Sequence, residues 1–347
     1  MTGSAPEFVD LTRLAAWMDN QRLETGPISG VTELSGGTQN ILLKFQRGGR
    51  DFVLRRPPIH PRPNSNDTMR REVRILAALS GTPVPHPHLI AACLTEDVLG
   101  TAFYLMEVVH GFNAKQGLPE RHAKDPALRR RMGFAIVEGT AALAQLDPVT
   151  RGLTDFGRSS GFLDRQVARW RGQLEGYREH SGWPGPAGLP YVERIGLWLD
   201  DHRPESYRPG VMHGDYHLAN VLFRMDSGEL AAIVDWELAT IGDPLLDLGW
   251  LVATWPDNDP PQPGQLFLVG PWDGFPTTGE LIAHYGTYTG QDMSAIPWYV
   301  VLACFKLAIV LEGTHARACA RLAEPRVGDE LHASAVYLLE RALSWMS

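Results

Sequence analysis

Two short polar segments, each following an apolar run, constrain the fold of this chain most strongly. The first is HGDYHLAN at residues 213–220, and the second is DWE at residues 235–237. Apolar runs as short as those beside them are typical of buried strands, and the polar residues then form the loops at the strand ends. The pattern therefore predicts that Asp215, Asn220 and Asp235 lie on two neighbouring loops.

Two carboxylates and an amide on adjacent loops form the set that phosphoryl transfer to a hydroxyl requires. One carboxylate accepts the hydroxyl proton, while the amide and the second carboxylate hold Mg²⁺ on the phosphates of a nucleotide. The protein-kinase catalytic loop has four residues between its Asp and its Asn. The same spacing separates Asp215 from Asn220. The alternative is that Asp215 and Asp235 only satisfy turns at strand ends.

These segments resemble the signature of the aminoglycoside phosphotransferase family, which includes choline kinase-like proteins. The resemblance rests on HGDYHLANVLF, starting at residue 213, and IVDWELATIGDPLLDLGW, starting at residue 233. It implies an α+β, protein-kinase-like fold with two lobes. An N-lobe with a five-stranded antiparallel sheet and helices would cover residues 1–109, and a mainly helical C-lobe would cover residues 110–347. ATP, or GTP, would bind between the lobes. Asp215 would be the catalytic base, and Asn220 and Asp235 would bind Mg²⁺.

The N-terminal third contains candidate nucleotide-binding residues. A turn between two predicted strands contains Gly36, Gly37, Thr38 and Asn40. Glycines let the backbone approach phosphates closely, although a glycine hairpin without a ligand is the alternative. Kinases keep their nucleotide loop at this place in the N-lobe. By the same resemblance, strand 101–109 leads into the hinge, where backbone groups of Glu107 and Val109 would meet the adenine edge. The Glu107 side chain could equally lie on the surface.

A predicted strand at residues 51–56 and a predicted helix at residues 68–79 contribute a charged pair. By the resemblance, Arg55 takes the place of the kinase lysine that contacts nucleotide phosphates, and Glu72 takes the place of its helix partner. Arg can fork onto phosphate oxygens, but Arg and Lys are not interchangeable. The alternative is that both side chains are solvated surface charges.

Composition narrows the range of partners and compartments. With 347 residues, 44% of them hydrophobic, the chain can form two lobes. A net charge of −8 without a long basic run argues against nucleic-acid binding. Three scattered cysteines and the lack of a leader pattern in residues 1–10 predict a cytoplasmic protein. The most apolar stretch, 298–311, is too short for a bilayer and predicts a core helix, without membrane association. A monomer and a homodimer both stay open.

We expect the acceptor of the phosphate to be a small hydroxylated molecule. Weaker signals in the sequence indicate its chemical class. Residues 153–170 resemble the subgroup of the family that is fused to, or encoded beside, acyl-CoA dehydrogenases, which favours a hydroxyacyl-CoA. Arg129 to Arg131 form a basic run that either suits an anionic acceptor or is a solvated helix face. A proline-rich loop carries three aromatic residues that could form an apolar wall for an acyl chain: Phe267, Trp272 and Phe275.

Two alternatives to this acceptor and activity stay open. Residues 255–347 carry 5 Lys and Arg against 10 Asp and Glu, a balance that would suit a polycationic aminoglycoside as the acceptor of a 3'-type O-phosphotransferase. A nucleotide-binding pseudokinase, or regulatory module, is the alternative of another class, because Arg55 replaces the usual Lys. The presence of Asp215, Asn220 and Asp235 argues against it.

Overall fold

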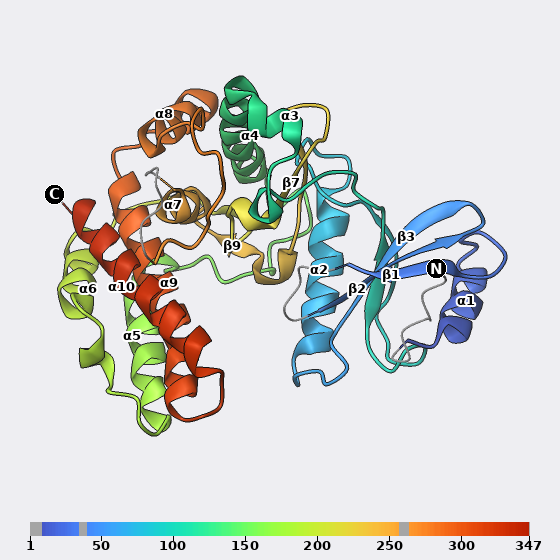
Figure 1. Ribbon diagram of the computed structural model, residues 1–347, viewed down its shortest axis with the longest axis horizontal. Helices are drawn as coiled ribbons and strands as arrows, with labels where there is room; N and C mark the ends of the chain where they lie inside the picture. Colours follow the sequence, from blue (N-terminus) through green and yellow to red (C-terminus); the bar gives the residue numbers. More distant parts are fainter. Residues whose placement is uncertain (1–8, 35–39, 257–263, 347) are drawn as a thin grey trace.

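A computed structural model of the chain describes residues 9–34, 40–256 and 264–346 and has two lobes (Figure 1). The smaller lobe contains a five-stranded sheet in the order β1-β2-β3-β5-β4, with antiparallel neighbours throughout. Its strands are β1 (Ser29–Glu33), β2 (Ile41–Arg47), β3 (Arg50–Arg56), β4 (Leu89–Cys93) and β5 (Phe103–Met106). The larger lobe is mainly helical. The predicted α+β architecture with two lobes is therefore confirmed.

Helix α1 (Leu11–Asn20) packs on the sheet through its apolar side. It begins at Asp10, whose carboxylate accepts hydrogen bonds from the backbone N–H groups of Thr12 and Arg13, at 3.0 and 2.9 Å. Its buried residues share one apolar core with alternate residues of the strands: Leu14, Trp17, Met18, Leu43, Phe45, Phe52, Leu54, Phe103 and Leu105. This period-two pattern leaves the other side chains of β3 and β5 on the opposite face of the sheet.

Helix α2 (Ser65–Leu79) lies between the sheet and the larger lobe (Figure 1). Its apolar residues Ile75 and Leu76 are fully buried in the core of the larger lobe. Arg71 on the same helix donates to the backbone carbonyls of Phe156 and Ala239, at 2.9 and 3.0 Å. These contacts fix α2, and any side chain on its inner face, relative to the helical lobe.

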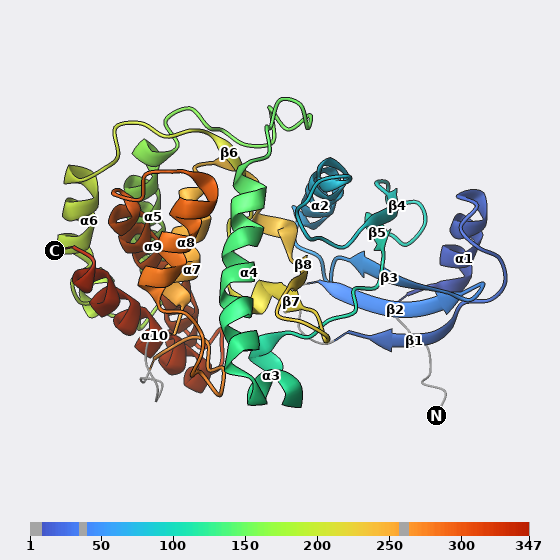
Figure 2. The same ribbon diagram turned by 90° about the horizontal axis from the view of Figure 1, so that it is seen from above.

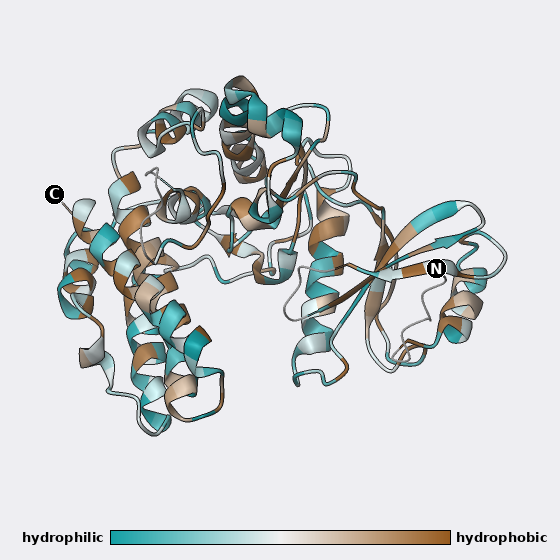
Figure 3. Ribbon diagram, viewed as in Figure 1, coloured by the Kyte–Doolittle hydropathy of each residue, from teal (hydrophilic) through white to brown (hydrophobic). Residues whose placement is uncertain are grey.

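The helical lobe is built around one long apolar helix, α9. Its helices are α3 (Glu120–Lys124), α4 (Pro126–Ala144), α5 (Gln166–Gly176), α6 (Val192–Asp201), α7 (Leu245–Thr254), α8 (Thr278–Thr289), α9 (Ile296–Cys319) and α10 (Pro325–Ser344). Helix α9, with 24 residues, extends beyond its most apolar part at 298–311 and meets the length and composition criteria for a membrane span, but 78% of its most apolar window is buried inside the fold. It is therefore best described as a core helix. In Figure 3 the side of α10 turned to the viewer is mostly hydrophilic, whereas α9 behind it is mostly apolar.

Four short strands carry the two polar segments singled out in the sequence. Strand β6 (Gly210–Met212) pairs with β9 (Thr240–Gly242), and β7 (Val221–Phe223) pairs with β8 (Leu230–Ile233). Figure 2 shows β7 and β8 beside α4, on the side of the helical lobe that faces the large sheet. The expected strands and loops around residues 213–220 and 235–237 are thus confirmed.

Close packing of α7 on α9 makes a glycine necessary at position 249. A Cβ atom added to Gly249 would lie 2.7 Å from backbone atoms of Tyr299, whereas one added to Gly172, on the exposed side of α5, meets nothing within 4 Å. We therefore expect Gly249→Ala to destabilise the protein by about 1–3 kcal/mol through overpacking. The matched variant Gly172→Ala should stabilise it by about 0.5–1 kcal/mol, because glycine disfavours a helix interior. Thermal unfolding of both variants measures this, and shifts in the same direction would contradict it.

Candidate active site

The backbone of the first loop is held by a buried carboxylate. Asp247, on α7, accepts hydrogen bonds from the backbone N–H groups of His213 and Gly214, at 2.6 and 2.8 Å. His213 Nε2 lies 2.9 Å from the carbonyl oxygen of Val234, and its Nδ1 accepts from the N–H of Asp215 at 3.3 Å. The His213 side chain therefore ties the first loop to the second.

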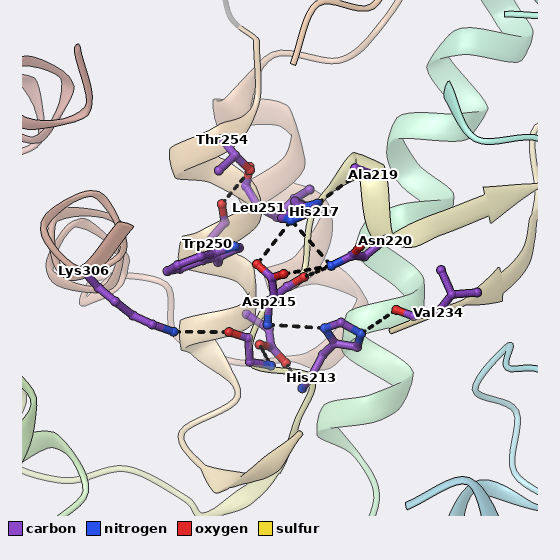
Figure 4. Close-up of polar contacts among 12 residues, drawn as sticks. His213, Asp215, His217, Ala219, Asn220, Val234, Trp250, Leu251, Thr254 and Lys306 are labelled. Carbon is purple, nitrogen blue, oxygen red and sulfur yellow. Dashed lines mark hydrogen bonds and ion pairs between the residues drawn. The ribbon is translucent and has the colours of Figure 1, made fainter. Parts of the chain in front are cut away.

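Asp215, His217 and Asn220 form a hydrogen-bonded group within this loop (Figure 4). Asn220 Nδ2 donates to Asp215 Oδ2 at 3.0 Å and to the Asp215 carbonyl at 2.9 Å. The N–H of Ala219 donates to His217 Nδ1, and Nε2 of the same ring lies 3.2 Å from Asp215 Oδ1. The three side chains orient the Asp215 carboxylate, and 29% of its surface stays exposed to a substrate.

The electrostatic environment keeps Asp215 ionised. Burial by itself would raise the pKa of Asp215, but the hydrogen bond from His217 and the electrostatic influence of His217, His213 and Lys306 outweigh it. The pKa of Asp215 therefore lies well below its usual range. Since the carboxylate is charged at neutral pH, it can accept a hydrogen bond from a hydroxyl group.

Both loops contain a residue with positive φ. Gly214 has a φ of +84°, and a Cβ atom there would lie 2.4 Å from the carbonyl oxygen of Leu238, so a side chain is excluded. Asp235 adopts the left-handed conformation, with a φ of 66°, although it is not a glycine. Such strain is typical of functional positions that the surrounding structure holds in place.

Arg55 joins the sheet and α2 to the second loop. Its Nε lies 2.8 Å from Glu72 Oε2, and its Nη2 lies 2.7 Å from Asp235 Oδ1. Tyr104 on β5 donates to Glu72 Oε2 at 2.7 Å, so that the fully buried Glu72 contacts both strands. The predicted contact between Arg55 and Glu72 is confirmed, and the alternative of solvated surface charges is wrong for both side chains.

Glu237 is a residue of this site that the sequence analysis did not assign. Asn40, at the start of β2, donates to Glu237 Oε2 at 3.2 Å and so links the edge of the nucleotide loop to the catalytic loops. Burial raises the pKa of Glu237, and Asp235, Glu72 and Asp215 raise it further, against the opposing effect of Arg55. A divalent cation would neutralise this excess of negative charge. The oxygen ligands that Asn220 and Asp235 offer therefore fit Mg²⁺. The only signal in the sequence was the position of Glu237 two residues after Asp235.

The remaining residues predicted to contact the nucleotide are those of the glycine turn and of the hinge. Gly36, Gly37 and Thr38 lie outside the described residues. The Glu107 side chain forms an ion pair with Arg50 at 3.4 Å, and its backbone N–H donates to the carbonyl of His88. That N–H is therefore engaged within the sheet and cannot meet an adenine edge without rearrangement. Both Glu107 and Val109 line a cavity of about 500 Å³ beside His86, His88 and His110.

A second cavity, of about 490 Å³, adjoins the first loop at Gly214. Its lining is unusually basic and includes Arg71, Arg158, Arg165, Arg169 and Lys306, together with Phe162, Trp170, Trp250 and Leu302. In the described part of the chain, none of the five cations forms an ion pair with a carboxylate; Arg165 donates to backbone carbonyls and Arg169 lies 4.9 Å from the ring centre of Trp170. The lining also contains the carboxylates of Glu237 and Asp247, so the cavity combines an excess of positive charge with an apolar wall.

Lys306 connects this cavity to the catalytic loop. Its Nζ donates to the carbonyl of Gly214 at 3.2 Å and lies 4.2 Å from the ring centre of Trp250 (Figure 4). Burial lowers the pKa of Lys306 to about 8, although Asp215 and Asp247 oppose the shift. Its signal in the sequence was a single lysine in an otherwise apolar helix, which the sequence analysis did not assign to the site.

The structure bears on two features that the sequence suggested for the acceptor site. Arg129, Arg130 and Arg131 do not form a free basic patch, because each pairs with carboxylates, namely Asp273, Glu280, and Glu138 with Glu229. The three aromatic residues suggested as an apolar wall are separated. Trp272 and Phe275 stack on each other against Trp255, whereas Phe267 lies beside the loop that carries Asp215, with its ring 4.7 Å from that of His217.

Comparison with known proteins identifies the family. The model of the phosphotransferase enzyme family, APH, matches residues 30–278, a range that contains β3, α2 and both catalytic loops. The chain belongs to this family. It is therefore a phosphotransferase-family protein with a kinase-like fold, as the sequence signature implied.

The curated relatives of this chain are much longer proteins, and the chain matches only part of each of them. The chain is 31% identical over 297 residues to acyl-CoA dehydrogenase family member 11 of Gallus gallus, and 28% identical over 297 residues to member 10 of Mus musculus. These matches cover 83% and 85% of this chain, but 36% and 27% of the two relatives. The chain thus spans about a third of the length of these proteins, and the resemblance to this subgroup is confirmed.

Solved structures share the fold. A Ralstonia eutropha protein provisionally described as an aminoglycoside phosphotransferase is 27% identical, with a TM-score of 0.81 and coverage of 97% of this chain and 98% of its own. A thermostable mutant of the aminoglycoside phosphotransferase APH(4)-Ia, solved with AMP-PNP and hygromycin B, is 17% identical, with a TM-score of 0.57 and coverage of 93% and 99%. The second likeness shows the fold alone.

The buried pair of Arg55 and Glu72 leads to a prediction about stability. Arg55→Met should destabilise the protein by about 3–5 kcal/mol, because it leaves the fully buried Glu72 without its cation. The double variant Arg55→Met/Glu72→Met should recover most of that loss, since it removes both charges. Denaturant unfolding of the wild type and of both single and double variants measures the coupling. Additive effects of the two substitutions would contradict the assignment.

Proposed function

We propose that this protein transfers the γ-phosphate of ATP to a hydroxyl group of a small molecule. The observation that carries the proposal is the convergence of an oriented, ionised Asp215 and Asn220 with Asp235 and the Arg55–Glu72 pair. Four separate segments of the chain supply this set, which matches the requirements of phosphoryl transfer. The AMP-PNP bound to the related APH(4)-Ia structure supports a nucleotide as donor, with GTP as the alternative to ATP.

Each residue of the set has a distinct role in this proposal. Asp215 accepts the hydrogen bond of the attacking hydroxyl and takes its proton as the new phosphate–oxygen bond forms and the bond from the γ-phosphorus to the leaving ADP breaks. Because the pKa of Asp215 is low, orientation of the hydroxyl is the larger part of its contribution. Asn220 and Asp235 would hold Mg²⁺, which neutralises charge on the nucleotide phosphates when bound. Arg55 lies where it can share its guanidinium between Asp235 and a phosphate oxygen.

For the acceptor we propose a hydroxyacyl-CoA rather than an aminoglycoside. The cavity beside Gly214 carries five cations and several aromatic side chains. A coenzyme A thioester carries phosphates and an acyl chain, so its charge and its apolar part both match this lining, whereas a polycationic amino sugar would be repelled. The names of the curated relatives, which are acyl-CoA dehydrogenase family members, favour the same substrate class.

Asp215→Asn tests the catalytic role. The amide keeps the shape of the carboxylate but cannot take a proton, so we expect kcat to fall by roughly 10²- to 10⁴-fold. The dissociation constant of Mg²⁺–ATP should stay within about twofold of the wild-type value, because Asp215 faces the acceptor. The matched control Asp201→Asn, at the exposed end of α6, should leave both values unchanged. Near-normal turnover by Asp215→Asn would mean that another group is the base.

A parallel assay tests the acceptor class. ATP consumption is measured with a 4-hydroxyacyl-CoA and with a kanamycin-type aminoglycoside, and we expect turnover with the thioester only. Arg169→Glu reverses one charge of the cavity and should raise KM for the thioester at least tenfold, without changing KM for ATP. The control Arg194→Glu, at an exposed position on α6, should leave both values unchanged. Efficient phosphorylation of the aminoglycoside alone would reject the acceptor while leaving the kinase assignment in place.

A further inference from the structure

A cluster of metal-binding side chains lies at the junction of α9 and α10, separate from the catalytic loops. Glu312 and His315 are on α9 and His332 is on α10, and one possible ligand atom from each lies within 4.8 Å of the others. Glu312 is six residues beyond Lys306, or about 9 Å along the helix. Residues three apart lie on the same helix face. The spacing of Glu312 and His315 is the Glu-x-x-His spacing by which facing helices of a bundle hold metal ions.

The buried charge of Glu312 needs compensation. Its side chain is completely buried, and its two oxygens contact the indole N–H of Trp183 and Nδ1 of His332, each at 2.7 Å. An indole N–H and a neutral imidazole are dipoles and supply no net charge. Within the described residues, no lysine or arginine forms an ion pair with Glu312. Since a buried carboxylate without a cation is strongly unfavourable, this position calls for a positive charge between Glu312 and the histidines.

A second histidine brings another nitrogen ligand to Glu312 and His332. The rings of His315 and His332 lie 4.5 Å apart, so both can face one ion. Nδ1 of His315 is buried and lacks a hydrogen-bond partner among the described residues, since Asp329 Oδ1 lies 3.6 Å away. A single divalent ion can be bound by two neutral imidazoles and one carboxylate at the same time, and it leaves no like charges in contact.

Cys319 offers a further possible metal ligand, a thiol, beside Glu312, His315 and His332. Its Sγ lies 3.6 Å from His315 Nε2. Nitrogen and sulfur ligands of one tetrahedral ion, at bond lengths of about 2.1 and 2.3 Å, are separated by about this distance. Cys319 follows His315 by four residues on α9, so both face the same direction. Asp329 would then stand at the other nitrogen of His315, as carboxylates often do behind a metal-bound histidine.

We propose that Glu312, His315 and His332 bind a divalent transition metal ion of the zinc class. Imidazole nitrogens with a carboxylate, next to a thiol, suit Zn²⁺ rather than Mg²⁺, which prefers an all-oxygen octahedral shell. The ion joins the last turns of α9 to the first turns of α10 and, through Trp183, the loop that precedes α6. It is a structural ion, distinct from any ion on the nucleotide.

Calorimetric titration of metal-free protein with ZnCl₂ tests this site. Millimolar Mg²⁺ is present throughout, to occupy the carboxylates of the catalytic loops. We expect one Zn²⁺ per chain and a rise in the melting temperature on binding, because the ion binds the native state. His315→Gln and His332→Gln should each weaken binding at least tenfold, and circular dichroism verifies that both variants are folded.

A matched control distinguishes this cluster from general binding by histidine and glutamate. His284 pairs with Glu138 at 2.9 Å, as His332 pairs with Glu312. Within the described residues, His284 and Glu138 do not belong to a group of three possible metal ligands. His284→Gln should therefore keep wild-type Zn²⁺ binding. The proposal is overturned if the wild type lacks stoichiometric binding, or if both His315→Gln and His332→Gln bind Zn²⁺ as the wild type does. The second outcome would show that Zn²⁺ binds elsewhere on the protein.

Discussion

The ion pairs of Arg55 with Glu72 and Asp235 are the interaction on which the assembly of the site depends. They join β3 of the sheet, α2, and the loop after β8, which are far apart in the sequence. Since Arg55 and Glu72 are almost fully buried, each charge is tolerated only when the other is present. Because α2 is also packed into the helical lobe, the pair fixes the position of the sheet relative to the loops that carry Asp215 and Asp235.

The catalytic loop is held by side chains rather than by a regular strand ladder. Asp247 accepts the two N–H groups at the start of the loop, and His213 spans to the second loop through Val234. Burying such groups is costly, and burial raises the pKa of Asp247 accordingly. In return, the positions of Gly214 and Asp215 are fixed before any ligand binds. Preorganisation of this kind is what phosphoryl transfer gains from a protein, because the reaction depends on positioning and electrostatics.

The distribution of arginines separates structural from functional charge. Arg129, Arg130 and Arg131 are consumed by ion pairs within the helical lobe, whereas the arginines beside Gly214 contact backbone carbonyls and aromatic rings. Only the second group can attract an anionic ligand. Related structures of the same fold include one that binds hygromycin B, so the fold itself does not determine the acceptor. The lining of this cavity is therefore the appropriate evidence on substrate class.

The sequence by itself determined the loops that carry Asp215, Asn220 and Asp235, because these depend on local periodicity and on spacing within short segments. The two-lobed α+β fold and the family followed from the resemblance of these segments to a known signature. The contact between Arg55 and Glu72 was also predictable, by resemblance. Only the tertiary structure decided which other charges matter. Arg129 meets Asp273 across 144 residues, and Lys306 meets Gly214 across 92. Whether a cation is neutralised or left facing a cavity depends on such long-range packing, which local patterns do not encode. For the same reason the approach of α9 to α10, which brings His332 to Glu312, was invisible in the sequence.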